Sequence, residues 1–205
     1  MSLNDGVLQL WVERLSLDPA AWTAGHALQL LLGKEAPARV GRADLWELEP
    51  EALTVEGDGS ALVARFDAWM RSSNLFMNPS RDKALLLDGA PGDTGPACGH
   101  VVCVERGLAT SRAHGLAVGH ALGGRWRVRR GTVWTLEWPA EHAEEVAALL
   151  PQAAWAKRRQ GGLLVNDQAQ DARLYVGAWE CPALPPDEVA AKTARSMGGS
   201  DGGVA

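Results

Sequence analysis

One stretch of the sequence occurs twice, and this repeat limits the possible folds more than any other feature. Residues 75–87 and 163–176 share a pattern: an apolar run, an asparagine, a polar turn and a second apolar segment. The two asparagines, Asn78 and Asn166, stand 88 positions apart. A chain that repeats such a pattern is expected to build two similar units.

Three further pairs of short segments match in the same order: residues 42–49 with 130–137, 25–28 with 119–122, and 12–14 with 104–106. Their offsets of 88, 94 and 92 positions indicate small insertions in loops, which vary more than packed elements. We infer a tandem duplication. The predicted divisions are a first repeat at 1–88, a Gly- and Pro-rich linker at 89–99, a second repeat at 100–179, and a partly disordered C-terminal tail at 180–205.

Hydrophobic periodicity predicts the same order of elements in both repeats. In the first repeat we expect a strand at 7–15 with one buried face, a helix from Asp18-Pro19 to Gly33, a hairpin at 39–49 turning near Gly41, a helix from Ser60 to Asn78-Pro79, and a strand at 83–87. In the second repeat we expect a strand at 100–104, a helix ending near Leu122, a hairpin at 125–138, a helix at 141–150 ended by Pro151, and a strand at 173–176.

This order, β-α-β-β-α-β, is that of the ferredoxin-like fold, an antiparallel sheet with both helices on one face. The predicted fold class is therefore α+β, with two ferredoxin-like halves. Each sheet would leave one face uncovered, and two copies can cover each other. We expect the halves to form an intramolecular pseudo-dimer.

Composition excludes several classes of protein. Hydrophobic residues are 46% of the 205 residues and charged residues 22%, which favours a packed core over a disordered chain. The net charge of −5 disfavours broad binding to nucleic acid or acidic membranes. No apolar run approaches the roughly 20 residues of a membrane span, and the first residues lack a signal pattern. We expect a cytoplasmic protein with its three cysteines reduced.

Short motifs of the first repeat follow one another in a set order: Leu17-Asp18-Pro19, Ala27-Leu28, Val40-Gly41-Arg42, Trp46-Glu47-Leu48, and Phe76-Met77-Asn78-Pro79 with Asp82. In this order they resemble the PurS family, the small subunit of phosphoribosylformylglycinamidine synthase. The second repeat keeps Ala121-Leu122, Val133-Trp134-Thr135-Leu136 and Leu163-Leu164-Val165-Asn166. It departs from the family at Thr110-Ser111, in place of Asp-Pro, and at Asp167, in place of the final Pro.

The resemblance implies an accessory role in purine biosynthesis without catalytic residues. The family looks like a docking piece that joins a synthetase (large) subunit to a glutaminase subunit, so that ammonia passes between them. Its members act as dimers, and a covalent tandem looks like that dimer made in one chain. The implied partners are these two subunits, with self-association left open. The chain would bind no cofactor, whereas the complex would use ATP and glutamine.

Seven residues are candidates for contact with a partner: His26, His120, Arg125, Arg127, Arg129, Asn78 and Asn166. The two histidines occupy matching helix positions; the alternative is a pair of inherited, partly buried histidines with backbone partners. The arginines would form one exposed basic face of a strand, suited to an acidic protein surface, to single-stranded nucleic acid, or to solvent at an edge. The asparagines are expected at helix ends.

Cys98, His100 and Cys103 form one loose group of potential metal ligands, whereas structural zinc sites usually have two close pairs. We therefore expect no metal, and no catalytic constellation stands out. Two other functions stay open: a protein-interaction or small-molecule-sensing module on the same tandem fold, and an enzyme with a site between the halves.

Overall fold

The computed structural model describes residues 7–52, 59–88, 97–106, 112–156 and 163–177. These residues form a mixed α+β fold with a six-stranded antiparallel sheet in the order β3-β1-β2-β5-β4-β6. The strands are β1 (Leu8–Arg14), β2 (Arg39–Ala52), β3 (Asp82–Asp88), β4 (Cys98–Glu105), β5 (Arg125–Glu137) and β6 (Gln170–Val176). The helices are α1 (Pro19–Leu32), α2 (Gly59–Ser73), α3 (Arg112–Leu122) and α4 (Val146–Ala154), with short 3-10 turns at η2 (Gly33–Glu35) and η3 (Ala140–Glu145).

The two predicted hairpins are wrong, because β2 and β5 are single long strands. Each half therefore runs β-α-β-α-β in the described residues. Gly41, which was predicted near a turn, and Gly131, in the second predicted hairpin, both lie inside strands and lack the positive φ of a tight hairpin turn. At Gly131 the glycine serves close strand packing, since an added Cβ would lie 2.1 Å from the Cys103 carbonyl oxygen.

The central strand pair carries the sequence repeat. In the β2–β5 register Asp44 pairs with Thr132, Arg42 with Trp134 and Trp46 with Arg130. Arg42 and Arg130 are 88 positions apart, and so are Trp46 and Trp134. Exchanging the two halves therefore turns the pair Arg42–Trp134 into the pair Arg130–Trp46. The register is thus symmetric about Asp44 and Thr132. The halves are thus joined edge to edge in one sheet, and the prediction of two sheets that cover each other's open faces is wrong.

The same register corrects one of the sequence matches. Val12 of β1 lies opposite Asp44, and Cys103 of β4 lies opposite Thr132. Val12 and Cys103 therefore occupy equivalent positions, which are 91 residues apart and not the predicted 92. The predicted match of residues 12–14 to 104–106 is thus displaced by one residue. The displacement matters because a shift of one residue moves a side chain to the other face of the sheet.

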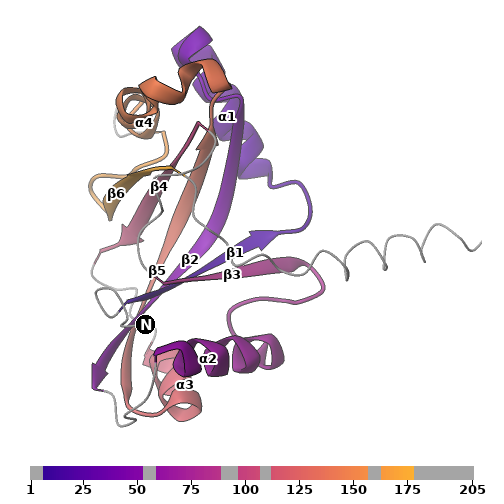
Figure 1. Cartoon of the computed structure of the whole chain (residues 1–205), viewed down its shortest axis with the longest axis vertical. Helices are drawn as coiled ribbons and strands as arrows, with labels where there is room; N and C mark the ends of the chain where they lie inside the picture. The colour runs from indigo at the N-terminus through magenta and orange to yellow at the C-terminus, as the bar shows by residue number, and fades with distance from the viewer. Residues whose placement is uncertain (1–6, 53–58, 89–96, 107–111, 157–162, 178–205) are drawn as a thin grey trace, which may run out of the picture.

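The helices lie in two pairs, α1 with α4 at one end of the sheet and α2 with α3 at the other (Figure 1). Each pair takes one helix from each half. Leu28 of α1 packs in one buried cluster with Leu150 of α4, and Phe66 of α2 packs with Leu122 of α3 in another. Both halves therefore contribute to both cores.

Helix boundaries differ from expectation at two places. α2 ends at Ser73, before the turn at Asn78, and α4 begins at Val146 after a 3-10 turn and continues through Pro151. A proline inside a helix crowds the carbonyl group four residues earlier. For Pro151 this carbonyl lies in the first turn of α4, next to the 3-10 turn, so the proline destabilises the helix only slightly. The predicted linker also ends early, because β4 begins at Cys98.

The helix-free face of the sheet carries a third buried cluster, which includes Trp11, Leu45, Val102 and Val133. Both faces of β1 are buried for this reason, not one face as predicted. Trp11 of β1 contacts His100 of β4 at 5.3 Å between ring centroids, although three strand spacings, about 14 Å, would separate them in a flat sheet. The sheet is therefore strongly curved around this cluster.

No helix within the described residues has the length and apolar character needed to span a membrane. The C-terminal tail and most of the linker lie outside the described residues.

Candidate functional site

A cavity of about 490 Å³ lies between α1 and the beginning of β2. Its walls come from α1, from the chain between β1 and α1, and from residues 38–42. Arg14, Leu17, Trp22 and Arg39 stand around it, and all four side chains are exposed. We call this cavity the β2-edge groove.

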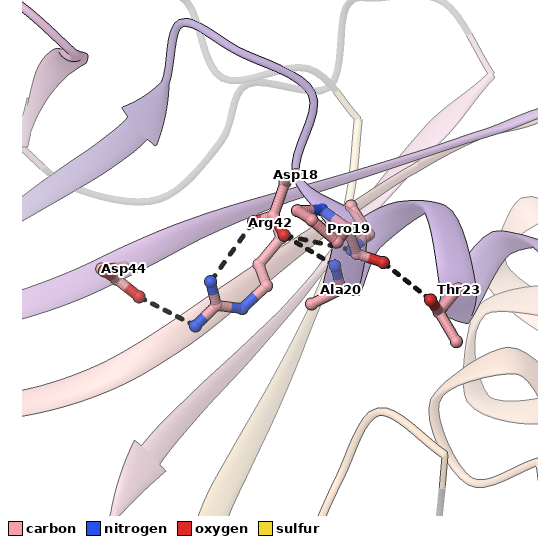
Figure 2. Close-up of polar contacts among 7 residues, drawn as sticks. Asp18, Pro19, Ala20, Thr23, Arg42 and Asp44 are labelled. Atoms are coloured by element: carbon pink, nitrogen blue, oxygen red, sulfur yellow. Dashed lines mark hydrogen bonds and ion pairs between the residues drawn. The ribbon is translucent and has the colours of Figure 1, made fainter.

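A network of polar contacts fixes α1 against β2 beside the groove (Figure 2). As predicted, Asp18 caps α1: its Oδ1 accepts hydrogen bonds from the N–H groups of Ala20 and Ala21 at 2.8 and 3.4 Å. The Arg42 guanidinium donates to Asp18 at 3.3 Å and to Asp44 at 2.9 Å. Burial alone would raise the pKa of Asp18, but the hydrogen bonds from Ala20 and Arg42 outweigh it and lower the pKa.

The strand edge along the groove has no partner strand in the described residues. β2 pairs with β5 along residues 39–50, whereas β1 pairs with β2 only from Ala43 onward. In an antiparallel strand, alternate residues present their N–H and C=O groups to each side. Residues 39–42 therefore offer backbone hydrogen-bonding groups toward the groove.

The matching place in the second half is closed. Trp126 stands where the first half has Ala38, is buried, and donates its indole N–H to the Gly123 carbonyl at 2.8 Å. α3 also lies close on β5, because added Cβ atoms at Gly115 and Gly119 would lie 2.5 and 2.7 Å from backbone oxygens of Trp126 and Gly124. In the second half, Trp126 and α3 thus occupy the space that forms the groove in the first half.

His26 and His120 are both exposed, so the predicted alternative of partly buried histidines is wrong. His26 lines the β2-edge groove and stacks on Trp22, with the ring planes 3° apart and the centroids separated by 5.9 Å. His120 lies on α3 beside the closed site. The structure therefore places one of the two predicted histidines in an open site.

The predicted arginines alternate with buried Trp126 and Val128 on β5, as the sequence pattern indicates. They do not lie on a hairpin edge, since β5 pairs with β2 along their whole length. Arg127 pairs with Glu49 and Glu51 at 3.5 and 3.1 Å. Arg125 is exposed and makes no ion pair with another described residue.

Arg129 belongs to an ion-pair network that the sequence did not indicate. Its Nη2 lies 3.2 Å from Oε2 of Glu47, whose side chain is fully buried, and Arg173 of β6 donates to the other carboxylate oxygen. The Arg129 contact is the poorer one, because Glu47 Oε2 and Arg129 Nε both lack a hydrogen-bond partner among the described residues. The network ties β2 of the first half to two strands of the second.

The potential metal ligands do not assemble. Cys98 and His100 share the helix-free face, with Sγ and Nε2 3.8 Å apart, whereas Cys103 points to the opposite face and approaches the Leu164 carbonyl. No group of three metal-ligating side chains occurs in the described part of the chain. Burial raises the pKa of Cys98 and of Cys103, the latter to about 11, and burial lowers the pKa of His100 to about 4. A neutral thiol next to a neutral imidazole is the opposite of an activated nucleophile.

Asn78 and Asn166 form the same turn twice. Their side-chain oxygens accept hydrogen bonds from the N–H groups of Ser80 and Gln168 at 3.0 and 3.2 Å, two residues on. Neither asparagine ends a helix: the first follows α2 by five residues and the second precedes β6. Their side chains thus stabilise loops that hold the outer strands β3 and β6.

The groove itself was missed in the sequence, because it depends on which edge of β2 stays unpaired. Comparison with protein families, with curated proteins and with solved structures finds no match to this chain. The functional argument therefore comes from the chain's own residues.

Proposed function

We propose that the chain is a non-catalytic docking subunit, built as an intramolecular pseudo-dimer of two halves related to the ferredoxin-like fold, each with one long strand in place of the predicted hairpin. Its place would be in a PurS-like position of a phosphoribosylformylglycinamidine synthase complex, between the synthetase and glutaminase subunits. The motifs that resemble the PurS family are the reason for naming this complex.

The observation that supports the proposal is the symmetric register of β2 and β5 around Asp44 and Thr132. Such a register is what two copies of one subunit would form about a two-fold axis, with the same strand of each at the junction. The shared helix pairs point the same way, because helices from both halves complete each core. This arrangement fits a family that acts as a dimer.

The chemistry of the described residues also fits a docking role better than catalysis. The Cys98–His100 pair is buried and held neutral, and the carboxylates of Asp18 and Glu47 are bound to arginines. These groups serve packing and cohesion.

A small-molecule-sensing module is the second candidate, and the β2-edge groove favours it. Its volume of about 490 Å³ lies within the usual range of ligand sites, about 300–1,000 Å³. A ligand that binds only the folded state would raise the melting temperature. Thermal shifts with nucleotides and purine intermediates, compared with an Ala38→Trp variant whose groove is filled, test this candidate.

The docking role is tested by isolating the tagged protein from native lysate with ATP and glutamine present, followed by mass spectrometry. We expect the synthetase and glutaminase subunits to be recovered together, and purified subunits to couple glutamine hydrolysis to amide transfer only when this chain is added. Full coupling without the chain, or recovery of neither subunit, contradicts the proposal.

A further inference from the structure

The β2-edge groove differs from its counterpart in the second half in ways that the fold itself does not require. Ala38 is exposed, and the matching Trp126 shows that the same framework accepts a large ring there. Across the groove, an added Cβ at Gly25 would meet Val40 at an ordinary 3.4 Å, whereas the matching Gly119 faces a backbone oxygen at 2.7 Å. The first half thus keeps open what the second half fills.

Gly41, in the middle of the unpaired edge, supports the same conclusion. An added Cβ would lie 3.6 Å from its nearest neighbour, Thr135, and the residue has no positive φ. By contrast, Gly131 is forced by the Cys103 carbonyl oxygen at 2.1 Å. A strand glycine without an internal reason is often found where another backbone approaches closely.

We propose that the β2-edge groove binds an extended segment of a partner protein, which adds a strand to residues 39–42 of β2. The backbone of the segment would take the free hydrogen-bonding groups of this edge. A small molecule would use the cavity but would leave the strand edge unpaired. This inference goes beyond the proposed function, since it holds for any partner that carries such a segment.

The side chains around the groove define the chemistry of the segment. On the α1 side lie Leu17, Trp22 and Val40, which favour apolar side chains on every second residue. On the helix-free face Arg39 is 76% exposed and only loosely paired with Glu137, so an acidic side chain can bind there. Arg14 has no partner among the described residues, while the nearby Glu13 lies opposite Lys83. The segment is therefore expected to alternate apolar and acidic residues.

Exposed apolar side chains are concentrated in the part of the chain that borders the groove. Among the described residues, seven large hydrophobic side chains are exposed, and five of them lie between residues 15 and 31: Leu15, Leu17, Trp22, Leu30 and Leu31. Clusters of exposed apolar residues mark interaction sites in soluble proteins. A protein partner accounts for this concentration of exposed apolar residues.

A second copy of the chain is a poorer occupant. If residues 39–42 of two copies paired as antiparallel strands about a two-fold axis, Arg39 of one copy would lie beside Arg39 of the other, or Arg42 beside Arg42. The two arginines would be either directly opposite or diagonal neighbours. Like charges at these positions destabilise a strand pair. The charge pattern therefore selects a different, acidic segment.

The test selects peptides from a displayed random ten-residue library on the immobilised full chain, with counter-selection on the Ala38→Trp variant. Ala38→Trp copies Trp126, and circular dichroism and thermal melting confirm that it folds. We expect enriched peptides with alternating apolar and acidic residues. Synthetic copies should bind the wild-type chain at least ten-fold more tightly than Ala38→Trp or Arg39→Glu, and more weakly at high salt.

Two further readouts separate strand addition from other modes of binding. Hydrogen exchange of the amides in residues 39–42 should slow when the peptide is bound. Trp22→Ala should weaken binding, while Leu116→Ala, at the matching position of α3, should leave it unchanged. Peptides that bind Ala38→Trp equally, or that leave exchange at residues 39–42 unchanged, overturn the inference. Failure to recover the purine enzymes would not affect it.

Discussion

The buried carboxylate of Glu47 makes the sharpest test of how the two halves are held together. Its side chain is fully buried between Arg129 and Arg173, whose side chains are 38% and 41% exposed. Removing one partner of a fully buried ion pair costs about 3–5 kcal/mol, because the remaining charge has no counter-charge. Here the two arginines can turn toward solvent, so we expect Glu47→Ala to lower the free energy of unfolding by about 2–3 kcal/mol.

The two arginines should contribute unequally. Arg173 donates a hydrogen bond to Glu47, whereas Arg129 approaches Glu47 without one and has an unpaired Nε. Arg173→Ala should therefore cost more than Arg129→Ala. In a double-mutant cycle, Glu47 and Arg173 should show a coupling energy of about 1–2 kcal/mol.

The assay is equilibrium urea unfolding at pH 7, with the slope m compared between variants. Because both halves complete both cores, one cooperative transition is expected. Glu51→Ala is the matched control: it removes an exposed ion pair with Arg127, worth at most about 1 kcal/mol. If Glu47→Ala and Glu51→Ala cost the same within about 0.5 kcal/mol, the reasoning about burial is refuted.

Three further predictions follow from the cores and the thiols. The pKa of His100 is about 4 in the folded state, against about 6.5 in the unfolded state, so the unfolded state binds more protons between pH 4 and pH 6.5. The free energy of unfolding should therefore fall by up to about 3 kcal/mol from pH 6.5 to pH 4. His100→Gln should lack this component in urea unfolding, and an unchanged pH profile contradicts the assignment. Cys98 and Cys103 should resist alkylation by iodoacetamide in the native protein, as read by peptide mass spectrometry, and react after denaturation; rapid native labelling refutes their burial. Gly131→Ala should lower the melting temperature far more than Gly41→Ala, since only the first meets a backbone oxygen at 2.1 Å, and equal effects contradict the packing argument.

Local signals of the sequence were confirmed where the physics is local. Asp18 and Pro19 begin α1, Gly33 follows its end with positive φ, and Phe66 and Met70 form the buried stripe of α2. Capping and helical periodicity depend on a few neighbouring residues, so sequence can show them. The repeat was visible for the same reason, since matching side chains fill matching places in strands.

The long strands were missed because glycine in a strand and glycine in a turn look alike in sequence. Gly41 and Gly131 differ only in what lies beside them, the open groove in one case and the Cys103 carbonyl in the other. Glu47 was missed for a related reason: its two arginines lie 82 and 126 positions away in the chain. Long-range pairing decides both, and no local pattern encodes it.

A covalent tandem permits a difference between its two halves that a symmetric dimer does not. In a dimer of identical chains, an open strand edge on one copy would be open on the other, and two exposed edges invite uncontrolled pairing. Here Trp126 and α3 fill the space beside one edge, while Ala38 and Gly41 leave the space beside the other edge available. The fusion therefore converts two equivalent sites into a single site on one side of the molecule, which suits a subunit that must bind one partner there.

Replacing Trp126 with Ala should expose the second edge, at a cost in stability from the lost ring, and a second peptide should then bind per chain in a titration. A stoichiometry that stays at one peptide per chain, in a variant that still folds, would refute this view of the fusion.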